Sequence, residues 1–244
     1  MKKMRLDKIL GNMGYGSRKD LKKIIKYGYV KVDGEVVSKS SIQVDPYENT
    51  IEINGERVEY REYIYIVMNK PQGVISATYD NRHQTVIDLL EEKYLPFDPF
   101  PMGRLDIDTE GMLIITNDGK LSHEILSPKK HIPKTYYAHV EGGVDEKDIK
   151  AFKEGITLDD GYKTQSSQLT IKESGDVSKI ELIIYEGKFH QVKRMFEARG
   201  KKVVYLKRIA MGDLKLDETL ELGEYKELSD EELKVLRGSM SNPD

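Results

Sequence analysis

The order of strand-type and helix-type segments after about residue 61 places the strongest constraint on how this chain can fold. Short runs rich in β-branched and aromatic residues, which are typical of strands, outnumber helix patterns and do not alternate strictly with them. The strand-type runs are "YIYIVMNKP", "GMLIITNDG", "KTYYAHVEG", "SKIELIIYEG" and "KVVYLKRIAMGDLKL". A doubly wound parallel sheet would need strict alternation, so this order predicts an α+β fold with a mixed, mostly antiparallel sheet flanked by helices and loops.

Helix signals in the same region are local ones. Capping residues and helical periodicity predict helices over residues 85–94 and 145–154, over the segment "HQVKRMFEARG", and after the capping box of Ser229 and Glu232. In the third of these, Val192, Met195 and Phe196 share the inward side. The three prolines of "LPFDPFP" predict an extended loop.

The first 60 residues predict a small separate module. A short amphipathic helix is followed by a second helix, which Ser17 caps with Asp20 as its reciprocal partner and which ends at Gly28. Two short strands then surround an Asp33-Gly34 turn. The second helix carries its apolar residues on one side and its basic residues on the other, namely Arg18, Lys19, Lys22, Lys23 and Lys26.

The charge distribution points to a polyanionic partner. The 244-residue chain has a net charge of −3, yet residues 1–31 hold ten Lys/Arg against two acids and residues 188–208 hold eight against one. Two basic blocks on a mildly acidic chain favour nucleic acid as the partner over a generally adhesive surface. The chain contains no cysteine and no apolar run approaching the ~18 residues that cross a bilayer, so we expect a cytoplasmic protein with no membrane partner.

The N-terminal pattern resembles the S4 RNA-binding domain over residues 4 to about 50. The residues that carry the resemblance are Arg5-Leu6-Asp7, Gly14, Ser17-Arg18, Ile25, Gly28, Val30, Val32 and Gly34. It implies recognition of folded RNA through phosphates by Arg5 and the basic helix side, because lysine and arginine release counterions from phosphates. The alternative is an amphipathic helix whose basic side only faces water.

The acidic residues clustered in "GRLDIDTEGMLIITNDG" are candidates for a chemical role. Asp106 and Asp108 form a D-x-D pair that suits magnesium, but a proline-rich loop precedes the pair where the aspartate-nucleophile phosphatases have a hydrophobic strand. The five histidines show no metal-binding spacing. A carboxylate pair for acid/base work stays possible, but neighbours such as Asp108 and Glu110 more often stabilise a turn. A single nucleophile is the better supported interpretation.

The same segment resembles the signature of the pseudouridine synthases, and further segments match that family in order. They are "NKPQG", "KTY", "EGKFHQVKRMF" and "LKRIAMGDL". With the S4 module the resemblance covers nearly the whole chain, and it is strongest for the RsuA-like branch that modifies ribosomal RNA. "FHQVKRMF" resembles the small-subunit 16S enzyme more than its large-subunit relatives, and Met112 stands where a leucine is usual.

The resemblance implies isomerisation of uridine to pseudouridine without cofactor or metal. By position, Asp106 is the carboxylate that acts at C1′, and Lys193 is the cation that keeps it ionised, at a position where the family often has arginine. Tyr136 is the aromatic that stacks on the target base, which leaves Tyr137 as the expected core residue. Arg104 contacts RNA and helps to hold the flipped nucleotide.

The other nearby residues receive structural roles. Asp108, Thr109 and Glu110 are predicted to build the turn that presents Asp106, and Lys70 with Pro71 to form architecture near the site. His190 has no predicted partner, so we expect a structural role for it.

The sequence therefore predicts a monomeric pseudouridine synthase acting on rRNA, most simply 16S rRNA. An S4 domain would span residues 1–60, a catalytic domain residues 61–237 beyond the charged linker "ERVEYRE", and a flexible tail residues 238–244. The alternatives are a synthase of the same family acting on 23S rRNA and a non-catalytic S4 protein that binds rRNA as an assembly factor.

Overall fold

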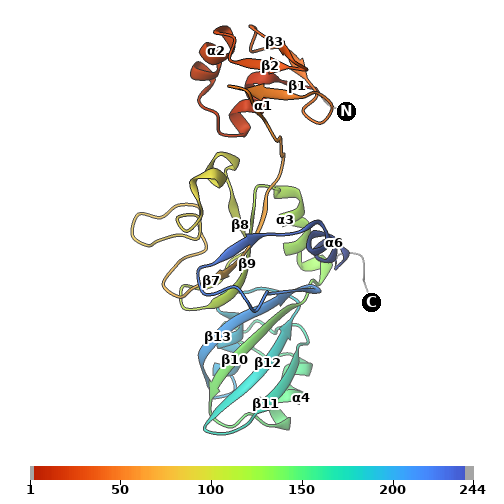
Figure 1. Ribbon diagram of the computed structural model, residues 1–244. Helices are drawn as coiled ribbons and strands as arrows, with labels where there is room; N and C mark the ends of the chain where they lie inside the picture. The colour runs from red at the N-terminus through yellow and green to blue at the C-terminus, as the bar shows by residue number, and fades with distance from the viewer. Residues whose placement is uncertain (1–2, 240–244) are drawn as a thin grey trace. The chain divides into compact units, whose positions relative to one another are not determined.

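The computed structural model of the protein describes residues 3–239, whose contacts divide the chain into two compact units (Figure 1). The first unit contains residues up to Ile64 together with Leu90–Pro99, and the second contains Tyr65–Leu89 and the chain from Phe100 onward. The sequence domains 1–60 and 61–237 remain a proposal, to which the contacts add that Leu90–Pro99 packs with the first unit.

The first unit is a pair of helices packed on small sheets. Its elements are β1 (Met4–Arg5), α1 (Leu6–Asn12), α2 (Arg18–Lys26), β2 (Val30–Val32), β3 (Glu35–Val36), β4 (Gln43–Val44), β5 (Ile51–Ile53), β6 (Glu56–Arg57) and the 3-10 helix η1 (Glu92–Phe97). The strand order is β3-β2-β5-β6, and β1 pairs with β4. Ser17 caps α2 as predicted, accepting a hydrogen bond from the Asp20 N–H at 3.3 Å. The apolar sides of both helices are buried with the strands at Leu6, Ile9, Leu10, Leu21, Ile25 and Val30.

The second unit is built on a nine-stranded sheet. Its strands are β7 (Tyr65–Lys70), β8 (Phe100–Met102), β9 (Glu110–Thr116), β10 (Lys134–Glu141), β11 (Gln168–Glu173), β12 (Val177–Ile184), β13 (Lys202–Met211), β14 (Leu214–Lys215) and β15 (Tyr225–Glu227). The main order is β11-β12-β10-β13-β9-β7-β15, with β14 beside β13 and β8 beside β9. β13 and β9 run parallel, and the other pairs are antiparallel. This confirms the predicted mixed, mostly antiparallel sheet.

Helices cover the sheet in two groups. They are α3 (Gly119–Leu126), the 3-10 helix η2 (Pro128–Lys130), α4 (Glu146–Glu154), α5 (Gln191–Glu197) and α6 (Asp230–Gly238). α3 and α6 bury Leu121, Ile125 and Leu236 in a core shared with β7, β8 and β9. α4 lies along β11 (Figure 1), and its Phe152 packs on Phe196 of α5 with ring centroids 4.8 Å apart.

Two predictions about residues 85–101 are wrong. Thr85 and Asp88 do not begin a helix: the Thr85 N–H and hydroxyl donate to Asp88 Oδ2 at 2.7 and 3.0 Å and close a turn. The same capping pair can serve either structure, so the pair alone did not decide between them. "LPFDPFP" is not wholly extended loop either, because it holds the end of η1 and, through Phe100 and Pro101, the start of β8.

The strand-type run "GMLIITNDG" ends at a helix start, α3, which was not predicted. Asp118 accepts a hydrogen bond from the Leu121 N–H at 3.0 Å and so caps α3. At the other end of the chain α6 runs to Gly238, and Ser239 accepts a hydrogen bond from the Asp213 N–H at 2.9 Å. The remaining part of the predicted tail, residues 240–244, lies outside the described residues.

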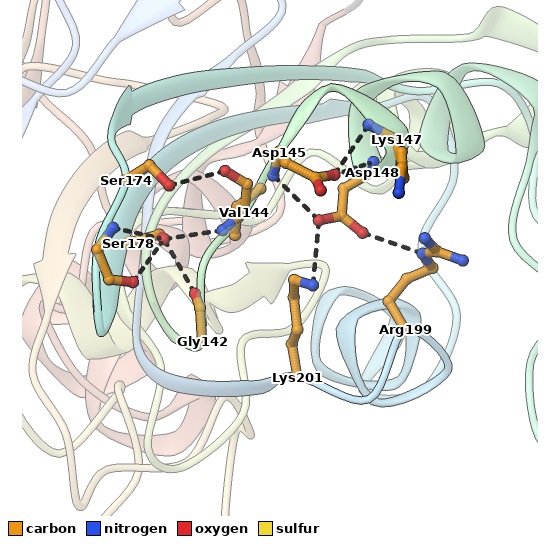
Figure 2. A network of polar contacts seen from close by, with 10 residues as sticks. Gly142, Val144, Asp145, Lys147, Asp148, Ser174, Ser178, Arg199 and Lys201 are labelled. Carbon is orange, nitrogen blue, oxygen red and sulfur yellow. Dashed lines mark hydrogen bonds and ion pairs between the residues drawn. The ribbon is translucent and has the colours of Figure 1, made fainter.

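A polar network ties α4 to the chain that follows α5 (Figure 2). Asp148 of α4 is 1% exposed and pairs with Arg199 Nε at 3.0 Å and Lys201 Nζ at 3.2 Å. Burial alone would raise the pKa of Asp148, but hydrogen bonds from Asp145, Arg199 and Lys201 outweigh it and lower that pKa. The network fixes the far end of α5, whose near end forms part of the cavity described below.

None of the helices within residues 3–239 is long and apolar enough to span a membrane.

Candidate active site

A cavity of about 410 Å³ opens in the second unit. Its floor is a face of β10 and β13, and its walls are the loop before β9 and the segment that leads into α5. Apolar and charged side chains share the lining, namely Arg104, Leu105, Asp106, Lys134, Tyr136, Ile184, Glu186, His190, Val192, Leu206 and Arg208 among others. This volume suits one small planar ligand with a few polar groups.

The loop that carries Asp106 is held by hydrogen bonds to the segment after β7. The Gly73 N–H donates to Ile107 O at 2.8 Å, and Ser76 Oγ exchanges hydrogen bonds with the backbone of Leu105 at 3.0 Å. The Thr109 N–H donates to Asp106 O at 3.1 Å and closes the turn. Because the backbone on both sides of Asp106 is bonded, the direction of its side chain is set by the loop.

Lys70 supports the same loop from inside the protein, in keeping with the architectural role predicted for it. Its Nζ is fully buried and donates to Pro71 O at 2.8 Å and to Thr109 O at 2.9 Å. Burial lowers the pKa of Lys70 to about 8, although the carboxylates of Asp106, Asp108 and Glu110 act in the opposite direction.

Asp106 lies beside two basic groups from the region of α5. Lys193 Nζ is 3.2 Å from Asp106 Oδ2, and His190 Nε2 is 3.6 Å from Asp106 Oδ1. The expectation that His190 has no partner is therefore wrong. Lys193 also donates to Asp108 Oδ1 at 2.6 Å, so Asp108 does more than build a turn.

The shared lysine is well placed to stay charged. Its side chain is 17% exposed against 28% for Asp106 and 62% for Asp108. Burial lowers the pKa of Lys193, but the two carboxylates outweigh it and the net shift is upward. For Asp108 burial acts upward, and the hydrogen bond and charge of Lys193 bring its pKa below the usual range.

Local sequence explains how α5 presents these groups. Val192, Met195 and Phe196 are buried as predicted, and Lys193 on another side of the helix reaches Asp106 and Asp108. His190 precedes the helix with φ 47°, a left-handed conformation. Arg194 forms a hydrogen-bonded ion pair with Asp159 and a second ion pair with Asp160, the latter at 2.6 Å.

The floor of the cavity follows from strand register. Tyr136 of β10 is paired with Leu182 of β12 and with Arg208 of β13. It is 9% exposed and lines the cavity. Tyr137 points to the other face, where it is half-buried, bonded to His139 Nε2 at 3.0 Å, and packed edge-on to Tyr205. The prediction that Tyr137 is the core residue of the pair is wrong.

Three buried charged residues of the cavity were not assigned from the sequence. Lys134, Glu186 and Arg208 each lie in a segment that carries the family resemblance, but no motif spacing marks them individually. Burial, followed by the charge of Arg208, lowers the pKa of Lys134 to about 8 against the effect of Glu186. Glu186 accepts hydrogen bonds from Tyr162 Oη at 2.6 Å and from Gln191 Nε2 at 2.9 Å.

Gly111 allows the Asp106 loop to approach β13. Its φ is 102°, and a β-carbon there would lie 2.2 Å from Arg208 O. The parallel pairing of Gly111 with Arg208 thus requires glycine for both conformation and space. This pairing links the backbone after the Asp106 loop to the backbone of β13, which forms part of the cavity floor.

The remaining predicted residues occupy two places. Arg104 is exposed and lines the cavity. In the first unit Arg5, Arg18 and Lys22 border a hollow of about 280 Å³, where Arg5 is held by Asp7 at 2.6 and 2.9 Å. The rest of the predicted RNA-binding set, Lys19, Lys23 and Lys26, is exposed along α2.

Within the described residues, no group of three or more His, Asp or Glu side chains is arranged to hold a metal ion. The absence of a metal and of a cofactor stays a prediction.

Comparison with known proteins follows the same division of the chain. The family model for RNA pseudouridylate synthase matches residues 64–198, and the S4 domain model matches residues 4–48. An uncharacterized RNA pseudouridine synthase of Bacillus subtilis, YtzG, is 52% identical, with 96% of this chain and 98% of the relative covered.

Relatives named for a ribosomal subunit are less similar. Ribosomal large subunit pseudouridine synthase B of Bacillus subtilis is 39% identical over 96% of this chain and 95% of its own. Ribosomal small subunit pseudouridine synthase A of Vibrio cholerae is 40% identical over 94% of this chain and 98% of its own. A crystal structure of a pseudouridylate synthase superposes with a TM-score of 0.67 at 37% identity, covering 96% of this chain and 99% of that one.

Proposed function

Because the chain belongs to the RNA pseudouridylate synthase family, we propose that it converts a specific uridine of ribosomal RNA, in the small-subunit 16S rRNA, to pseudouridine. The observation that carries the proposal is the Asp106 carboxylate, 3.2 Å from Lys193 Nζ, at a cavity that Tyr136 also lines.

Asp106 is the proposed nucleophile. Breaking the bond between uracil N1 and C1′ leaves C1′ electron-deficient, and an ionised carboxylate can stabilise it or bond to it. The ring then turns over and C5 bonds to C1′, so the product has the same atoms as the substrate and no cofactor is consumed. Lys193 favours the ionised carboxylate by charge and hydrogen bond.

Tyr136 and Arg104 are proposed to bind the flipped nucleotide. The tyrosine ring lies in the cavity floor, where a base can stack on it, an interaction worth ~1–3 kcal/mol. Arg104 stands exposed at the same cavity, where it can contact the RNA backbone and hold the nucleotide out of its helix. The S4 residues Arg5, Arg18, Lys19, Lys22, Lys23 and Lys26 are proposed to bind phosphates, with the protein acting as a monomer.

The choice of 16S rRNA rests on the segment "FHQVKRMF", which resembles the small-subunit enzymes. A 23S target is the second candidate, because a relative named for the large subunit is 39% identical, against 40% for one named for the small subunit. Carbodiimide mapping of pseudouridines in both rRNAs from a deletion strain distinguishes them: the missing modification identifies the substrate.

A direct test of the mechanism uses Asp106→Asn. This variant should keep its affinity for rRNA and lose tritium release from RNA that contains 5-tritiated uridine. Retained turnover would exclude Asp106 as nucleophile. An rRNA-binding assembly factor without activity is supported instead if the wild-type protein binds rRNA and forms no pseudouridine.

A further inference from the structure

Two buried cationic side chains stand next to each other in the floor of the cavity. Lys134 comes from β10 and Arg208 from β13, and both line the cavity beside Tyr136. Arg208 reaches this position through a bulge: the register changes from Thr135–Ala210 to Tyr136–Arg208, which leaves Ile209 without a partner on β10. Bulges of this kind redirect side chains next to active sites.

Arg208 has an unused donor. Its Nε donates to Met112 O at 2.8 Å, which fixes the plane of the guanidinium. Its Nη2 is buried and has no hydrogen-bond partner among the described residues, in a side chain that belongs to a residue only 3% exposed. A buried donor without an acceptor is costly, and Arg208 lines the cavity, so a small shift of its side chain toward an acceptor bound there would relieve that cost.

The nearby acids do not neutralise the pair. Across residues 3–239, neither Lys134 nor Arg208 takes part in an ion pair within 4.0 Å. Burial lowers the pKa of Lys134, and Glu186 is the carboxylate that acts to raise it. Glu186 accepts hydrogen bonds from Tyr162, Gln165 and Gln191. Asp106 accepts a hydrogen bond from Lys193 at 3.2 Å. The floor therefore holds two cations that form no ion pair, beside an aromatic ring, and one carboxylate of the cavity, Glu186, acts on Lys134.

We propose that Arg208 and Lys134 bind the carbonyl oxygens of the target uracil and stabilise the negative charge that builds on the ring when its bond to C1′ breaks. This inference rests on the proposed function, since it concerns the leaving group of that reaction. Tyr136 would hold the plane of the ring, and the two cations at its edge would meet O2 or O4.

The electron balance shows why such groups matter. The bonding pair between C1′ and N1 leaves with the ring and spreads to its two carbonyl oxygens, while Asp106 takes up the deficit at C1′. After rotation, an electron pair from C5 forms the new bond to C1′, and Asp106 leaves C1′ as the free carboxylate; the C5 proton then departs, and N1 gains a proton. Donors fixed where charge develops typically contribute about 10²–10³-fold in rate.

The test compares two leaving groups under single-turnover conditions at saturating RNA. Arg208→Gln should slow cleavage in uridine-containing rRNA by about 10²-fold. It should slow loss of 5-fluorouridine from the same site by less than tenfold, because the fluorinated ring carries negative charge more readily and depends less on the protein. Lys134→Met should show the same pattern. Lys207→Gln is the matched control, since Lys207 neighbours Arg208 on β13 but does not line the cavity, and its rates should change less than twofold.

A binding measurement separates the base from a phosphate. Wild-type protein should bind barbiturate, a uracil-like ring that is anionic at neutral pH, more tightly than uracil, and Arg208→Gln should lose that preference. Binding of inorganic phosphate in place of barbiturate would overturn the proposal and assign the patch to the RNA backbone.

The outcomes are distinct. Equal losses on both nucleosides in folded Lys134 and Arg208 variants would overturn a role in charge stabilisation, and unchanged rates would overturn any role. If Arg208→Gln does not fold, Lys134→Met and the barbiturate preference of the wild type decide. A wild-type protein that binds rRNA but forms no pseudouridine would instead refute the proposed function, and this inference with it.

Discussion

Lys193 of α5 places its ammonium group 3.2 Å from Oδ2 of Asp106, although 87 positions separate the two residues in sequence. The same ammonium group is 2.6 Å from Asp108, which is far more exposed. Asp106 and Asp108 therefore share one cation, the ammonium group of Lys193. Of the two carboxylates, only Asp106 lines the cavity.

The first prediction separates these two contacts. Lys193→Met should lower the single-turnover rate of pseudouridine formation by about 10²-fold or more, because Asp106 loses the charge-assisted donor that favours its ionised form. Asp108→Asn removes the competing negative charge and should change the rate less than tenfold. Tritium release at saturating RNA measures both. A larger loss for Asp108→Asn than for Lys193→Met would mean that the exposed carboxylate is the functional partner.

The second prediction concerns alkaline stability. Lys134 and Lys70 have folded-state pKa values of about 8, below the ordinary 10.5. Between these two pKa values each lysine is protonated in the unfolded chain and deprotonated in the folded protein. The free energy of unfolding therefore increases as the pH rises from 8 toward 10.5. Each contributes up to about 1.4 kcal/mol per pH unit.

Urea unfolding between pH 8 and 10 checks this, since the tyrosines with raised pKa values act at higher pH. Lys134→Met should have a higher free energy of unfolding than the wild type. This difference should be greatest at or below pH 8 and should shrink toward pH 10. A difference that is constant with pH would show that Lys134 titrates normally in the folded protein.

The third prediction tests the basic side of α2. Replacing Lys22, Lys23 and Lys26 by glutamine should weaken rRNA binding and reduce the slope of log affinity against log salt by about 2–3, because each phosphate contact releases close to one counterion. The matched control replaces the exposed Lys147, Lys150 and Lys153 of α4. Filter binding over a range of salt concentrations measures the affinity and the slope for both triple variants. Equal changes in the two variants would show that the basic side of α2 is not the RNA-binding surface.

The fourth prediction concerns the network of Figure 2. Asp148→Asn should lower the free energy of unfolding by about 2–3 kcal/mol at neutral pH, somewhat less than for a fully buried pair because Arg199 is partly exposed. Asp159→Asn, which breaks an exposed pair with Arg194, should cost less than about 1 kcal/mol. Because its pKa is lowered, Asp148 stabilises the fold above its ordinary pKa of 3.8, and this contribution is lost as the pH falls below that value. Denaturant titrations at pH 7 and pH 3 check both statements.

The parts of the fold that the sequence predicted depend on local signals. Ser17 and Ser229 cap helices because each accepts a hydrogen bond from a backbone N–H three residues on. The periodicity of Val192, Met195 and Phe196 determines which side of α5 is buried. The pair Thr85 and Asp88 carries an equally local signal, yet the chain there closes a turn.

The candidate site shows the same limit. Motifs placed Asp106, Tyr136 and Lys193 in the prediction, and the structure brings them together. Arg208 and His190 were missed as residues of the cavity because their positions depend on features that no spacing encodes. One is the bulge at Ile209, which only strand register defines, and the other is the left-handed conformation of His190.

The position of β13 in the sheet has a consequence for how the protein folds. β13 lies between β10 and β9, although it comes after both in the sequence and begins only at Lys202. One edge of β10 and the Glu110–Gly111 end of β9 therefore stay unpaired until this late strand enters, and Gly111 can meet Arg208 only then. During synthesis the two halves of the sheet wait as separate pieces with unpaired edges, which are the groups most prone to aberrant pairing. Assembly of the cavity and the joining of the two parts of the sheet are thus the same event, and a chain cut before β13 would lack both.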